Sequence, residues 1–198
     1  IPPLDAPTQQ QALQRQRQLT KPSGALGKLE ILSAQVAGMT QNLDWLPQRP
    51  TVIVCAGDHG IAEQGVSAYP RSVTKEMVAN FLNGGAAINV LARQMNVEMI
   101  VVDAGVAGIL PEHERMIDGK INYGTADFSS SPAMSLQHTR QAVELGLRVV
   151  GQQIDAGANI ILTGEMGIGN TTAAAALIAA ITSADVERVT GRGTGISQ

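Results

Sequence analysis

The sequence predicts an α/β protein built on a doubly wound, mainly parallel sheet, and three observations carry this prediction. Apolar runs of strand length recur along the chain, and each is followed by glycines and then by a segment of helical periodicity. These runs are continuously apolar, which is typical of a parallel sheet covered on both faces. Aromatic residues make up only 3% of the chain although 44% is hydrophobic, so the expected core consists of aliphatic side chains.

The first fifty residues differ in pattern from the rest. Residues 7–19 are rich in glutamine, and residues 26–39 carry apolar side chains at helical spacing. Two prolines in the stretch 46–50 mark a linker. We therefore expect a helical N-terminal subdomain over residues 1–50 and an α/β domain over residues 51–198.

Strands and helices are expected to alternate through the α/β domain, with right-handed crossovers between parallel strands. Ser135 is a suitable N-cap for the longest helix, because its side-chain oxygen can accept a hydrogen bond from a first-turn N–H group. Together these elements indicate a Rossmann-like fold. The strands are expected at residues 51–56, 99–102 and 159–163, and the helices at residues 73–82, 86–95, 136–156 and 173–180.

The chain is organised around residues 159–172. An apolar, β-branched run there meets Gly164, Gly167 and Gly169 and then the alanine-rich run 173–180, which predicts a strand, a tight loop and a helix. The N–H groups and the dipole at a helix N-terminus favour an anion, and glycines let that anion approach the backbone closely. A phosphate site is therefore expected at this loop.

The same loop argues against two common nucleotide sites. Asn170 stands where a P-loop needs its lysine, so an NTPase is disfavoured. Thr172 replaces the third glycine of a dinucleotide fingerprint, and no acid follows about 20 residues later to hold a ribose hydroxyl. A monophosphate cradle with the Glu165 carboxylate beside it remains. The alternative is an ordinary strand-to-helix turn with an exposed glutamate.

A second glycine cluster lies at residues 190–195, where glycines alternate with Arg192 and two threonines. Such a loop offers backbone donors and a guanidinium group to a phosphate or a carboxylate. A flexible turn explains the composition equally well. Because one short helical stretch separates it from the first glycine turn, we expect both to face the same anion.

Acids follow the predicted strands at Asp58, Asp103 and Glu165. Ligands of doubly wound sheets bind outside the carboxyl ends of the strands, although acids and glycines are also common in such loops. With His59, these carboxylates are the candidates for a hard cation. No pair among them has the spacing of a metal signature, so neither a metal site nor a cofactor is predicted.

The composition limits which binding partners and which cellular compartment are expected. The net charge of −3, without a basic run, argues against nucleic acid or an anionic membrane as the main partner. Cys55 is the only cysteine and lies inside an apolar run, which is typical of a buried thiol in a reducing compartment. Neither a signal peptide nor an apolar stretch of 18 residues occurs. A cytoplasmic, soluble protein is expected.

Seven motifs occur in succession along the chain. They read LTKPSGALG, GDHGI, GVSAYP, VT, FLNGGAAIN, GEMGIGNTT and GRGTG, beginning at residues 19, 57, 65, 73, 81, 164 and 191. Together they resemble the nicotinate-nucleotide–dimethylbenzimidazole phosphoribosyltransferase family over essentially the whole chain. The resemblance implies transfer of phosphoribose from nicotinate mononucleotide to 5,6-dimethylbenzimidazole, which gives α-ribazole 5′-phosphate and nicotinate for the lower ligand of cobalamin. It also implies a homodimer that needs no cofactor.

The resemblance further implies roles for individual residues. Glu165 resembles an active-site carboxylate at the ribose. The implied phosphoribose- and nicotinate-binding residues are Gly164, Met166, Gly167, Ile168, Gly169, Asn170, Thr171, Thr172, Gly191, Arg192, Gly193 and Thr194. The implied benzimidazole-binding residues are Ser67, Ala68, Tyr69, Met77 and Phe81, of which Met77 and Phe81 fit core packing equally well.

Family members continue well beyond the second glycine cluster, and the glutamate usually assigned as catalytic base lies in that further part. We therefore expect the 198 residues alone to lack turnover. Two function classes stay open at this point: a phosphoribosyltransferase, and a binding module that holds a nucleotide or a heteroaromatic base without turnover.

Overall fold

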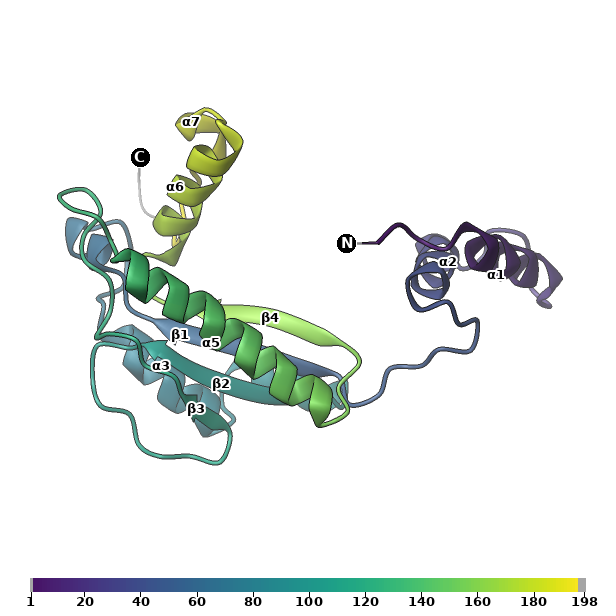
Figure 1. Ribbon diagram of the computed structural model, residues 1–198, viewed down its shortest axis with the longest axis horizontal. Coiled ribbons are helices and arrows are strands. Elements are labelled where there is room, and N and C mark those ends of the chain that lie inside the picture. Colours follow the sequence, from purple (N-terminus) through teal and green to yellow (C-terminus); the bar gives the residue numbers. More distant parts are fainter. Residues whose placement is uncertain (1, 196–198) are drawn as a thin grey trace. The chain divides into compact units, whose positions relative to one another are not determined.

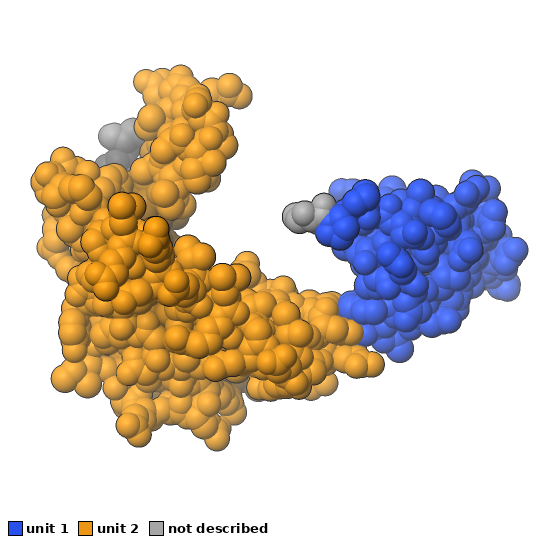
Figure 2. Space-filling view, viewed as in Figure 1, with its two compact units in different colours: residues 1–47 blue, residues 48–198 orange. Residues whose placement is uncertain are grey.

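The computed structural model describes residues 2–195, which divide into two compact units. The first unit spans residues 1–47 and the second spans residues 48–198, as coloured in Figure 2. Within the described residues, no helix combines the length and the apolar character needed to cross a lipid bilayer.

The first unit is a pair of helices, α1 (Ala6–Gln18) and α2 (Lys28–Thr40). The Asp5 carboxylate accepts a hydrogen bond from the Thr8 N–H group at 2.9 Å, which satisfies one donor at the start of α1. Both helices expected in the N-terminal region are therefore present. Small side chains form their buried contact: Ala12, Ala34 and Ala37.

The second unit is built on a four-stranded parallel sheet with the strand order β3-β2-β1-β4. β1 (Thr51–Gly57) pairs with both β2 (Glu98–Gly105) and β4 (Ile161–Met166), and β3 (Met116–Asp118) flanks β2. The sequence did not predict β3, because three residues carry too little periodic signal. All four carboxyl ends lie at one edge of the sheet.

Helices cover both faces of this sheet (Figure 1). On one face, Val52 and Val54 of β1 pack in a cluster with α3 (Val73–Leu82). On the other face, Ile53 packs in a cluster with α5 (Leu136–Asp155). The period of two along a strand explains why its neighbouring residues face opposite helices. These layers confirm the predicted doubly wound α/β fold.

The helix boundaries follow the sequence signals closely. α3 has the predicted bounds, and α4 (Ala87–Gln94) begins one residue after the predicted start. The Ser135 hydroxyl accepts a hydrogen bond from the His138 N–H group at 3.1 Å, so the predicted N-cap of α5 is confirmed.

The last elements stand away from the sheet (Figure 1). α6 (Asn170–Thr182) leaves the carboxyl end of β4 and, in the described part of the chain, buries only Ala175. Its Ile181 side chain is 80% exposed. α7 (Val186–Val189) and the 3₁₀ helix η1 (Gly60–Gln64) are short elements that the sequence did not predict.

The strand order reverses at β1. The chain leaves β1 through α3 and α4 toward β2, whereas β4 lies on the opposite side of β1 and leads into α6. In open α/β sheets, ligands bind in the crevice outside the strand ends at such a switch point. The topology therefore places a candidate site between the carboxyl ends of β1 and β4.

Candidate functional site

A cavity of about 400 Å³ lies at this switch point, and we call it the strand-end pocket. Its walls are mostly apolar, with the polar groups of His59, Glu165, Asn170 and Thr171 among them. A mostly apolar pocket with a few polar groups suits a flat heteroaromatic ligand. The wall residues are Cys55, Ala56, Gly57, His59, Ala104, Glu165, Met166, Asn170, Thr171, Ala173, Ala174 and Leu177.

The glycine turn, residues 167–169, joins β4 to α6. Gly169 is the N-cap of α6 and has a φ of 87°, which favours glycine. Two N–H groups of this region are bound locally: Asn170 donates to the Gly167 carbonyl, and Thr172 donates to the Gly169 carbonyl. The predicted phosphate cradle is therefore a strand-to-helix turn whose N–H groups are partly used within the protein.

A buried threonine supports the turn from α3. The Thr74 side chain is fully buried, and its hydroxyl accepts a hydrogen bond from the Ile168 N–H group at 3.1 Å. The sequence did not reveal this role, because 94 positions separate the two residues. Its only signal was a polar residue in the first turn of an otherwise apolar helix face.

Replacing Thr74 by valine should lower the free energy of unfolding by about 1–3 kcal/mol, because the buried Ile168 N–H group loses its acceptor. Urea unfolding of the variant measures this change. Thr139→Val is the matched control, since the Thr139 hydroxyl donates to the Ser135 carbonyl at an exposed position. A Thr74 variant no less stable than the control would contradict the supporting role.

Gly167 packs closely against the end of β1. A Cβ atom at Gly167 would lie 2.1 Å from the Gly57 carbonyl oxygen and 2.9 Å from two ring atoms of His59. Such separations are too short for a side chain, so only glycine fits this position. Contact with the end of β1, as well as the backbone angles of the turn itself, therefore determines the conformation of the turn.

The second glycine cluster reaches two of the predicted ligand-binding segments. The Thr194 hydroxyl accepts a hydrogen bond from the Ala68 N–H group at 2.9 Å and lies 3.3 Å from the Ser67 hydroxyl. A Cβ atom at Gly193 would lie 2.9 Å from the Thr171 hydroxyl oxygen. The loop 191–195 therefore lies between the segment 67–69 and the first turn of α6.

The remaining predicted site residues differ in their exposure to solvent. Tyr69 is exposed, and so is Arg192. Phe81 is buried in the core, where Met77 packs against the same cluster. Core packing thus accounts for both side chains, and their predicted contact with a benzimidazole stays a prediction. The roles of the other predicted site residues also stay predictions.

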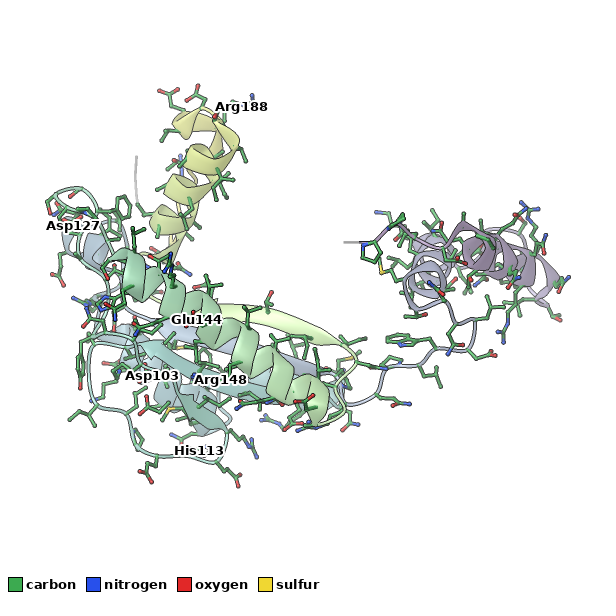
Figure 3. The ribbon with its side chains drawn as sticks, in the orientation of Figure 1. Asp103, His113, Asp127, Glu144, Arg148 and Arg188 are labelled. Carbon is green, nitrogen blue, oxygen red and sulfur yellow. The ribbon has the colours of Figure 1, made fainter. Side chains whose placement is uncertain are left out.

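The three acids after the predicted strands have different environments. Asp103, shown in Figure 3, is buried and pairs with the Lys120 ammonium group at 2.7 Å. Its other oxygen accepts the N–H groups of Gly105 and Val106, so its role is structural. Asp58 is also buried, whereas Glu165 is exposed in the strand-end pocket. Sequence position alone could not separate these cases.

No cluster of three or more histidine, cysteine, aspartate or glutamate side chains is arranged to hold a metal ion within the described range 2–195. Asp58 and Glu165, the two acids at the candidate site, have different surroundings. The Asp58 carboxylate accepts the Ala107 N–H group at 2.6 Å and lies 3.5 Å from Arg71. Glu165 faces the strand-end pocket.

A model of a protein family described as phosphoribosyltransferase matches residues 1–198. The chain belongs to this phosphoribosyltransferase family. The resemblance of the seven motifs to a phosphoribosyltransferase family is thereby confirmed over the whole chain.

Two curated relatives with similar sequences have the same protein name. The nicotinate-nucleotide–dimethylbenzimidazole phosphoribosyltransferases of Roseiflexus sp. (strain RS-1) and Chloroflexus aggregans are 57% and 55% identical to this chain over 196 residues. These matches cover 99% of this chain and 56% of each relative. The chain therefore spans just over half the length of the curated relatives it matches.

A solved structure shows the same fold. The crystal structure of CobT from Thermus thermophilus superposes with a TM-score of 0.92 at 43% sequence identity. The superposition covers 97% of this chain and 58% of the Thermus chain. The α/β architecture of this chain is therefore shared with a relative of known structure.

Proposed function

We propose that this chain supplies the phosphoribosyl-donor site of a nicotinate-nucleotide–dimethylbenzimidazole phosphoribosyltransferase. The names of its relatives support the reaction. The observation that carries the proposal is the meeting of three distant segments at the switch point. The first turn of α6 approaches the loop 191–195 at Thr171, and the same loop is bound to the segment 67–69 through Thr194 and Ala68.

The proposed reaction exchanges one ring for another at the anomeric carbon of the ribose. The bond between this carbon and the pyridinium nitrogen of nicotinate mononucleotide breaks, and nicotinate leaves as a neutral pyridine ring without needing a general acid. An azole nitrogen of 5,6-dimethylbenzimidazole forms the new bond, and the other azole nitrogen loses its proton to a base. In-line attack inverts the anomeric centre, so the main task of the protein is to position both rings.

Each part of the donor has a counterpart at the site. The turn before α6 offers the positive end of a helix dipole to the phosphate. The Thr171 hydroxyl lies in the first turn of this helix, and the loop that carries Thr194 reaches it through Gly193. The Glu165 carboxylate is the acid that faces the strand-end pocket. There it is suited to stabilise positive charge that develops on the ribose, or to accept the azole proton.

Calorimetric titration of the 198-residue chain with nicotinate mononucleotide tests this proposal. We expect saturable binding that inorganic phosphate weakens by competition. Titration without a saturable heat would overturn the proposed donor site. A parallel assay with 5,6-dimethylbenzimidazole, read as α-ribazole 5′-phosphate by chromatography, separates transfer from binding without turnover. Full turnover by this chain would assign the azole proton to one of its own groups, such as Glu165, and would contradict the base that the family resemblance implies elsewhere.

The homodimer is a further proposal, which rests on the family resemblance. The α2 helix leaves apolar side chains exposed, among them Leu29 at 62% and Ile31 at 60%. Analytical ultracentrifugation at micromolar concentration should show a dimer. A single monomeric species would contradict it. The cytoplasmic location also stays a prediction.

A further inference from the structure

His59 lies between two cavities at the carboxyl edge of the sheet. The second cavity, of about 160 Å³, we call the inner cavity; its walls include Asp58, Thr125 and His138. Gly57, His59 and Ala104 belong to the walls of both cavities. The His59 side chain is thus part of the partition between the strand-end pocket and the inner cavity.

The imidazole is held against the glycine turn. Its Cδ2 and Nε2 atoms each lie 2.9 Å from the place that a Cβ atom would take on Gly167. At the next residue of the turn, the Ile168 N–H group donates a hydrogen bond to the Thr74 hydroxyl of α3. The turn is therefore in contact with both the imidazole and α3, and a displaced ring would disturb the packing at Gly167.

Strand pairing brings Glu165 to the same pocket as His59. β1 and β4 are parallel neighbours, and Cys55 pairs with Glu165 in their register. Since His59 follows the end of β1 and Glu165 lies near the end of β4, the two side chains face the strand-end pocket from adjacent strands. No other histidine lines that pocket within the described residues.

Burial and three charged side chains act on the imidazole. Burial is the largest effect and lowers the pKa of His59 below its ordinary value. The carboxylates of Glu165 and Asp58 oppose this shift of the pKa, while the Arg71 guanidinium adds to it. The ring is therefore neutral at neutral pH, with one nitrogen as donor and the other as acceptor.

We propose that His59 is a positioning residue for phosphoribosyl transfer, whose imidazole spaces the β1 end from the glycine turn and orients the Glu165 carboxylate toward the strand-end pocket. The inference rests on the proposed function and deepens it. Its physical basis is that a neutral ring can hold a carboxylate through one hydrogen bond without neutralising the charge that the reaction uses. A charged imidazolium would compete with the developing positive charge on the ribose for Glu165.

Long-range ¹H–¹⁵N NMR spectra of the imidazoles test the coupling directly, because the chain has only three histidines. We expect His59 to titrate below the ordinary histidine pKa of about 6.5. Glu165→Gln removes a negative charge, so it should lower the His59 pKa further. Glu144→Gln on α5, where Figure 3 labels Glu144, is the matched control and should leave it unchanged. An unchanged His59 pKa in Glu165→Gln would overturn the coupling.

Addition of nicotinate mononucleotide provides the second readout. Donor binding should shift the His59 ring signals and leave those of His113, in the loop before β3 (Figure 3), at their free positions. Donor binding by calorimetry without any change at His59 would overturn this inference and leave the proposed function intact. Absence of donor binding would overturn the proposed function and, with it, this inference.

Kinetics of the complete transferase separate positioning from a purely structural role. His59→Ala should lower kcat and kcat/KM together, on the order of 10²-fold, because the misplaced groups act mainly in the transition state. His59→Gln, which retains a donor and an acceptor, should recover part of the rate. His113→Ala is the control. Wild-type kcat in a folded His59→Ala enzyme would contradict the positioning role.

Discussion

Glu165→Gln should slow phosphoribosyl transfer by roughly 10²–10⁴-fold in the complete, active transferase. Glutamine keeps the size of the side chain but carries no charge and cannot accept the azole proton. It also cannot stabilise positive charge on the ribose as the transition state forms. The exposed position of Glu165 in the strand-end pocket makes a large loss of stability unexpected, so the effect should fall on kcat.

Steady-state kinetics with nicotinate mononucleotide as the varied substrate measure this effect. Glu144→Gln, an equal change at an exposed site on α5, should keep wild-type kcat. A loss under tenfold in Glu165→Gln, with unaltered KM, would show that Glu165 has no direct part in the reaction.

Gly167→Ala should abolish donor binding and also destabilise the second unit. The new Cβ would lie 2.1 Å from the Gly57 carbonyl oxygen, and backbone cannot move aside as the end of a flexible side chain can. Overpacking of this kind costs about 1–3 kcal/mol. The ends of β1 and β4 would have to separate, which displaces both His59 and the first turn of α6.

Urea unfolding and donor calorimetry measure the two effects of Gly167→Ala separately. Gly191→Ala is the matched control, because a Cβ atom at Gly191 would meet no heavy atom within 4 Å. It should retain wild-type stability. Unchanged stability and affinity in Gly167→Ala would contradict the close approach of the two strand ends.

The sequence predicted those features of the fold that depend on neighbouring residues. The strand, glycine turn and helix around residues 159–182 follow from an apolar run, glycines and alanines in succession, and the structure has β4 and α6 there. The Ser135 cap was predictable because capping depends on residues only three positions apart. The order of the strands could not be predicted, since it depends on pairing between distant segments.

Long-range contacts explain what the sequence did not reveal. Thr74 supports Ile168 across 94 positions, and His59 meets Gly167 across the β1–β4 pair. Asp103 looked equivalent to Glu165, but its pairing with Lys120 makes it structural. Such roles depend on which loops the fold brings together, and composition carries no signal for that.

A crystal structure of the 198-residue chain with bound nicotinate mononucleotide tests the central claim most directly. We expect the donor phosphate at the glycine turn, within hydrogen-bond reach of Thr171 and Thr194, and the ribose beside Glu165 in the strand-end pocket. A donor bound at another edge of the sheet, with the glycine turn and the loop 191–195 unoccupied, would contradict it.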